Sequence, residues 1–143
     1  ALAAPSSVAG AMDMDDGEGF PIETAKEKIL TVLQTQLGPT PFIHAKTSLW
    51  ATTIIENILK ELKEINDEYA KAGQEEGIVS LWKFIVTCHL QQKTGAGMQS
   101  ATCCYWDKEK DGHFTVKFDN TGFHEAVGTD AIEAIVTIFY TAL

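Results

Sequence analysis

The first half of the chain repeats its apolar residues every three or four positions, which is the spacing of one helix face. The first repeat runs from Ile22 to Leu37 and stops at Gly38-Pro39, so we expect an amphipathic helix there. Thr40-Pro41 favours a second helix start, because a hydroxyl cap followed by proline is typical of helix N-termini. The stripe that follows contains Trp50, Ile54, Ile58, Leu62, Ile65 and Tyr69. Beyond it, residues 71–77 are predicted to form a solvated loop.

The apolar period changes from 3.6 to two near residue 80, which indicates a change from helix to strand. We expect strands over residues 82–91, 98–106, 113–119 and 129–143. The last is favoured as a strand by its β-branched and aromatic residues. Helices followed by strands predict an α+β fold, with two N-terminal helices packed on an antiparallel four-stranded sheet arranged as a meander.

The predicted strand over residues 98–106 has mixed polarity on both faces. One face carries Met98, Ser100, Thr102, Cys104 and Trp106, and the other carries Gln99, Ala101, Cys103 and Tyr105. A strand that is covered on one side usually has one apolar face. This strand therefore lies either at a subunit boundary or binding edge, or in the middle of a sheet over a small core.

Composition and charge narrow the classes of function. The chain has 143 residues and a formal net charge of −9, and its eleven basic residues are all lysine. Such a charge repels nucleic acid and anionic membranes, and arginine, the usual reader of phosphates and bases, is absent. Residues 1–19 lack periodicity and are predicted to form a disordered acidic tail before a single domain over 20–143. Three cysteines, two of them adjacent, favour a reducing compartment.

Candidate catalytic and metal-binding groups are few. Gly95-Ala96-Gly97 lies between two predicted strands without the third glycine of a phosphate cradle, which favours a hairpin turn. A metal site is not expected, because no C-x-x-C pair is present and neighbouring side chains of a strand face opposite sides. One alternative stays open: a small cytosolic thiol-dependent enzyme or redox protein that uses Cys88, Cys103 or Cys104. A strongly lowered thiol pKa would favour it.

Four short motifs carry a family resemblance. They are His44-Ala45-Lys46 with Trp50, Lys83-Phe84-Ile85-Val86-Thr87-Cys88, Gln92-Lys93-Thr94-Gly95-Ala96-Gly97 and Cys104-Tyr105-Trp106-Asp107. With them the chain resembles the Tctex-type dynein light chains, most specifically between residues 83 and 118. The Glu-rich stretch over 60–77 and the loop over 120–128 look longer than is usual in that family.

The resemblance implies a non-catalytic dynein light chain without a cofactor or metal. It implies a strand-exchanged dimer, formed with an identical or a related light chain, in which Met98, Ser100, Thr102 and Cys104 belong to the exchanged strand. It also implies that the dimer holds an extended segment of a dynein intermediate chain along Gln99, Ala101, Cys103, Tyr105 and Trp106. The implied location is the cytoplasm and cytoskeleton, as part of a microtubule motor complex and without membrane insertion, or the axoneme of a cilium or flagellum if the dynein is axonemal.

Overall fold

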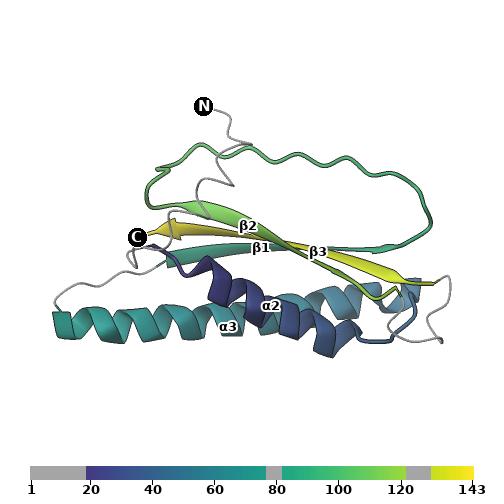
Figure 1. Cartoon of the computed structure of the whole chain (residues 1–143), viewed down its shortest axis with the longest axis horizontal. Helices are drawn as coiled ribbons and strands as arrows, with labels where there is room; N and C mark the ends of the chain where they lie inside the picture. Colours follow the sequence, from purple (N-terminus) through teal and green to yellow (C-terminus); the bar gives the residue numbers. More distant parts are fainter. Residues whose placement is uncertain (1–18, 77–81, 122–129) are drawn as a thin grey trace.

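Two helices cover one face of a three-stranded antiparallel sheet (Figure 1). The computed structural model describes residues 19–76, 82–121 and 130–143, with only the backbone of 72–76. Its elements are α2 (Ile22–Leu37), the short 3₁₀ helix η2 (His44–Lys46), α3 (Thr47–Glu76), β1 (Trp82–Gln92), β2 (Gly112–Asp119) and β3 (Ile132–Ala142). The predicted α+β class is confirmed. The predicted acidic tail, apart from residue 19, and most of the loop over 120–128 lie outside the described residues.

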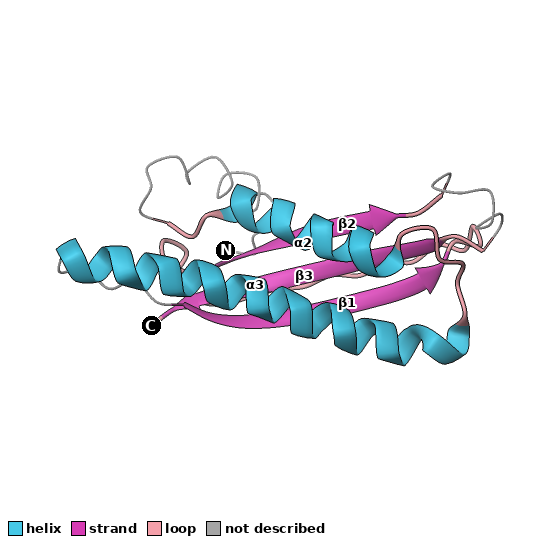
Figure 2. Ribbon diagram, turned by 90° about the horizontal axis from the view of Figure 1, so that it is seen from below, coloured by secondary structure: helices cyan, strands magenta, loops and turns pink. Residues whose placement is uncertain are grey.

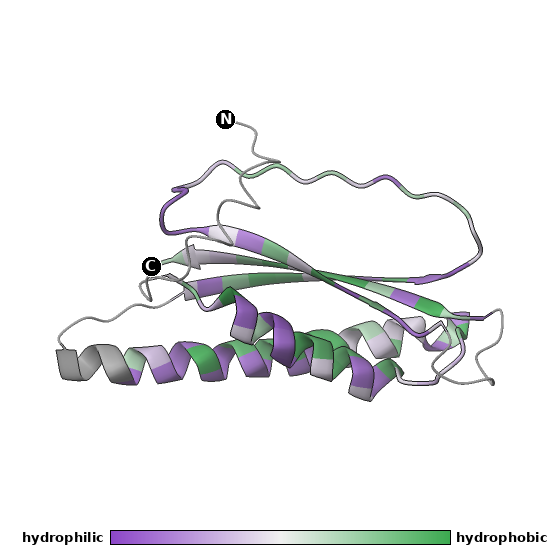
Figure 3. Ribbon diagram, in the orientation of Figure 1, coloured by the Kyte–Doolittle hydropathy of each residue, from purple (hydrophilic) through white to green (hydrophobic). Residues whose placement is uncertain are grey.

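The core lies between the helices and the sheet. The α3 stripe is fully buried at Ile54, Ile58, Leu62 and Ile65 and half-buried at its two ends, Trp50 and Tyr69. From β3, every second residue meets it: Ile132, Ala134, Val136, Ile138 and Tyr140. α2 packs over β2 and α3 over β1 (Figure 2), and the apolar sides of both helices face the sheet (Figure 3). The alternate inward residues of β3 and the apolar stripe of α3 therefore pack in one shared core.

Helix boundaries follow local signals at α2 but not at α3. α2 spans the predicted residues, and its last turn is closed by the Gly38 N–H donating to the Gln34 carbonyl at 3.0 Å. The predicted second start at Thr40-Pro41 is wrong, since α3 begins at Thr47. Phe42 N–H instead donates to the carbonyl of Asp130 at 2.7 Å, so this backbone is used in a tertiary contact.

The loop predicted over residues 71–77 is also wrong for residues 71–76, which continue α3. Lysine, alanine, glutamine and glutamate, which predominate there, are good helix formers, and they carry the helix past the end of the sheet (Figure 1).

The strand order is β1-β3-β2, so the predicted meander is wrong. β3 is the central strand and pairs antiparallel with both neighbours; Val136, for example, lies opposite Cys88 on one side and Val116 on the other. The inward residues of β3 from Ile132 to Ile138 are 0% exposed and Tyr140 is 5% exposed, which is the burial expected of a central strand.

The predicted fourth strand, residues 98–106, is not part of this sheet. Between β1 and β2, residues 93–111 run back along the sheet as an extended arch on the side away from the helices (Figure 1). Within the described part of the chain, no ladder hydrogen bond joins this arch to a strand. Because of its mixed polarity, the segment over 98–106 has no apolar face that would hold it against its own sheet. This explains why it is not the fourth strand of that sheet.

Candidate protein-binding site: an extended segment and an incomplete sheet edge

Residues 98–106 of the arch carry no charge, in a chain of which 22% is charged. We call these residues the extended segment. All are exposed except Cys104 and Trp106, which are half-buried; Tyr105 is fully exposed and Met98 is 54% exposed. An exposed extended stretch without charges is a feature of surfaces that another chain covers.

The C-terminal end of the extended segment is anchored on the helix-free face of the sheet. The Trp106 ring lies 6.2 Å from the ring centroids of both His113 and Phe139, which stack on each other at 5.8 Å. A turn follows, in which an Asp111 carboxylate oxygen accepts the Ala142 N–H at 2.8 Å. The segment therefore reaches β2 with its last residue in a fixed position.

Gly112 allows this turn to close against the sheet. A Cβ added at Gly112 would stand 2.2 Å from the Tyr140 hydroxyl oxygen and 2.5 Å from its ring carbon Cζ. Because Tyr140 is buried in the core, it has no room to withdraw. Glycine is therefore required where β2 begins.

The two edges of the sheet differ in how well the helices cover them. On β2, the inward residues Phe114, Val116 and Phe118 are buried beneath α2. On β1, the inward residues Phe84, Val86, Cys88 and Leu90 pack against the core but stay half-buried under α3. A further strand beside β1 would bury more apolar surface than one beside β2, so β1 is the incomplete edge.

The helix-free face has an uncharged centre. Cross-strand pairing places Ile85 and His113 on either side of Phe139, and in the next row Thr87 and Thr115 on either side of Thr137. The hydroxyls of Thr115 and Thr137 are hydrogen-bonded at 3.2 Å, and Ile85 is 62% exposed. The centre of this face thus presents rings, hydroxyls and the exposed Ile85 side chain and, among its described residues, no charged group.

The environments of Cys88 and Cys104 do not resemble that of an activated nucleophile. Burial raises the pKa of the Cys88 thiol to about 11, so this thiol stays protonated at neutral pH. Burial, together with the neighbouring Cys103, also raises the pKa of Cys104. The described residues contain no group of three or more metal-binding side chains, and none of the described helices is long and apolar enough to cross a membrane.

The sequence of the chain is similar to those of a known family of proteins. Residues 19–141 match the model of the Tctex-1 family. The chain belongs to this family. A Tctex-type dynein light chain of Dictyostelium discoideum is 31% identical over 102 residues, which cover 68% of this chain and 81% of that protein. One from Drosophila melanogaster is 30% identical over 110 residues, covering 75% and 87%. The human Dynein light chain Tctex-type 3 is 28% identical over 121 residues, covering 85% and 93%. The predicted family is confirmed.

In this Tctex-1 chain the residues predicted to bind partners all lie on the extended segment. The set predicted to bind the intermediate chain is Gln99, Ala101, Cys103, Tyr105 and Trp106, and the set predicted for the dimer strand is Met98, Ser100, Thr102 and Cys104. Of these, Trp106 is the one whose ring contacts other aromatic side chains of the sheet. The predicted hairpin at Gly95-Ala96-Gly97 is wrong, because β1 leads into the arch, with Gly95 at a φ of 84°.

The incomplete edge of this Tctex-1 domain could not be predicted from its sequence. The alternation along β1 showed which residues face inward but not that β1 lies at the border of the sheet. That position follows from the order β1-β3-β2, which depends on pairings distant in sequence.

Proposed function

We propose that this chain is a non-catalytic dynein light chain whose dimer holds an extended segment of a dynein intermediate chain, supporting assembly of the motor complex and cargo attachment. The names of its relatives support the assignment to dynein. The single observation that carries the binding mode is the exposed, uncharged extended segment in a sheet with an incomplete β1 edge. In the cell this places the chain in the cytoplasm on the microtubule motor, or in the axoneme if the dynein is axonemal.

In the proposed dimer, each subunit lends residues 98–106 to the β1 edge of its partner. The pairing gives the backbone N–H and C=O groups of the extended segment a ladder of hydrogen bonds. It also covers the half-buried row over Phe84, Val86, Cys88 and Leu90. The partner is a second copy of this chain or a related light chain. In the proposal either one supplies a strand that pairs through its backbone.

The outer edge of the exchanged strand is the proposed groove for the intermediate chain. An extended peptide adds there as one more strand, so that backbone pairing supplies affinity and alternate side chains supply specificity. Gln99, Ala101, Cys103 and Tyr105 share one face of this strand, and Trp106 anchors its end. Such binding suits a segment that is disordered when free.

The dimer is tested by measuring mass in solution. We expect the purified chain at micromolar concentration to sediment with about twice its 15.6 kDa monomer mass. If it stays monomeric, mixing with a related light chain distinguishes a heterodimer, which would shift the mass on mixing. A folded chain that remains a monomer in both experiments contradicts the proposal.

The groove is tested at Tyr105, whose side chain is fully exposed in the single chain. Tyr105→Ala is expected to weaken binding of an intermediate-chain peptide by about tenfold, because exposed tyrosines are common anchors at interfaces. The dimer mass should not change, and Tyr105→Phe, which keeps the ring, serves as the control. Unchanged peptide affinity in Tyr105→Ala, or amide protection by the peptide on α2 and α3 instead, would place the groove elsewhere.

A further inference from the structure

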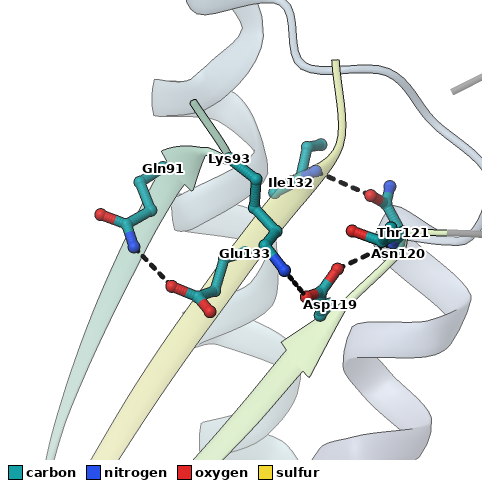
Figure 4. Close-up of polar contacts among 7 residues, drawn as sticks. All are labelled: Gln91, Lys93, Asp119, Asn120, Thr121, Ile132 and Glu133. Atoms are coloured by element: carbon teal, nitrogen blue, oxygen red, sulfur yellow. Dashed lines mark hydrogen bonds and ion pairs between the residues drawn. The ribbon is translucent and has the colours of Figure 1, made fainter. Parts of the chain in front are cut away.

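An ionic cluster lies where the arch leaves β1 (Figure 4). The Lys93 side chain reaches across β3 to form an ion pair with Asp119 at the end of β2, while the Lys93 backbone N–H donates to the Ala131 carbonyl at 2.9 Å. Gln91 Nε2 donates to the Glu133 carboxylate at 2.5 Å. We call Gln91, Lys93, Asp119 and Glu133 the Lys93 latch. Its contacts join β1 to β3 and the first residue of the arch to the end of β2.

The sheet register makes Lys93 necessary in this position. Asp119 on β2 lies directly opposite Glu133 on β3, and like charges at opposed positions destabilise a sheet. Burial of the Asp119 carboxyl favours its neutral form, but hydrogen bonds from Lys93 and Thr121 outweigh burial and lower its pKa. The hydrogen bond with Asp119 correspondingly raises the pKa of Lys93. Both groups therefore stay charged at neutral pH.

The latch also determines the direction in which the arch begins. Lys93 is held at its backbone and its ammonium, and Gly95 turns two residues later with a φ of 84°. The other end is held by Trp106 on Phe139. Anchoring both ends reduces the conformations open to the residues between them, which lowers the entropy cost of ordering that stretch against a partner.

We propose that the Lys93 latch positions the extended segment for exchange into a second copy of this chain or a related light chain. The proposal rests on the strand-exchanged dimer proposed above. Lys93 acts as a positioning residue: it does not contact the partner strand but holds the exit from β1 in the orientation from which residues 98–106 reach across.

Reversing one charge of the latch tests this role. Lys93→Glu places a third carboxylate beside Asp119 and Glu133, and it is expected to weaken dimer association by roughly five- to tenfold in sedimentation equilibrium. The matched control is Lys60→Glu, the same change of charge at an exposed position on α3, outside the proposed dimer edge. This control should leave dimer association within about twofold.

Rescue variants distinguish a positioning role of Lys93 from a general loss of folding stability. Lys93→Arg and the double reversal Lys93→Glu/Asp119→Lys both restore opposite charges at the pair, so both should dimerise within about twofold of the unaltered chain. In Lys93→Glu, amide exchange should speed up over residues 94–105 and stay unchanged in the centre of β3. If Lys93→Glu does not fold, Lys93→Gln carries the same test with an effect of about threefold.

The outcomes distinguish this inference from the proposed function. Normal dimerisation of Lys93→Glu, or faster exchange spread through β2 and β3, overturns the latch while the dimer stands. Failure of the double reversal to rescue also overturns it. If the unaltered chain forms no dimer, alone or with a related light chain, the proposed function itself fails.

Discussion

Phe20→Ala is expected to lower the free energy of unfolding by about 3–5 kcal/mol, the usual cost of removing a buried aromatic ring. Phe20 is 1% exposed and lies at the centre of four other rings. Its centroid is 4.7 Å from that of Tyr140 and 5.2 Å from that of Trp82, with Phe84 and Phe114 also in contact range. Removing it leaves a cavity between the start of α2 and the sheet. Urea denaturation should show a lower midpoint with an unchanged slope.

Phe20→Leu is the matched control, because it fills most of the cavity and should cost about 1–2 kcal/mol. An Ala variant as stable as the unaltered chain would show that the residues before α2 do not belong to the core.

Asn120→Ala is expected to lower the free energy of unfolding by about 2–4 kcal/mol, since it leaves two backbone groups without partners. Asn120 is fully buried; its side-chain amide donates to the Thr40 carbonyl at 2.7 Å, and its side-chain oxygen accepts the Ile132 N–H at 2.7 Å. It thus joins the α2–η2 connection to the start of β3. Thermal unfolding followed by circular dichroism gives the measurement.

Asn66→Ala provides the comparison for Asn120. Asn66 accepts the Trp82 N–H at 3.0 Å from a half-buried position, so its loss should cost only about 1 kcal/mol. If the two variants lose the same free energy of unfolding, the burial of Asn120 does not cause the larger loss expected there.

Elements with strong local signals were predictable from sequence. α2 has a continuous apolar stripe and a Gly-Pro stop, and the β-branched and aromatic residues of β3 favour a strand. The start of α3 was not predictable, because the Phe42–Asp130 hydrogen bond joins residues far apart in the chain. The extended segment has mixed polarity on both faces, and no strand of its own sheet pairs with it in the described structure. Its pattern identifies a segment suited to pairing but not the chain that supplies the partner.

Part of the candidate site could likewise be predicted from the sequence and part could not. The motifs around Cys88 and Trp106 were sufficient to predict the family, because they are short and contiguous. The Lys93–Asp119 ion pair was not predictable, since it joins residues 26 positions apart across a third strand. Only the strand order and register bring such residues together.

The exposed extended segment links the survival of this chain to its abundance. A protein that binds a partner only when folded gains stability as the concentration of that partner rises. In the proposed dimer the partner is another light chain, so dilution leaves residues 98–106 open to proteolytic cleavage and to pairing with unrelated strand edges. Cells that produce too little of either subunit would therefore clear the remainder, and the amount of light chain would be limited by degradation as well as by synthesis.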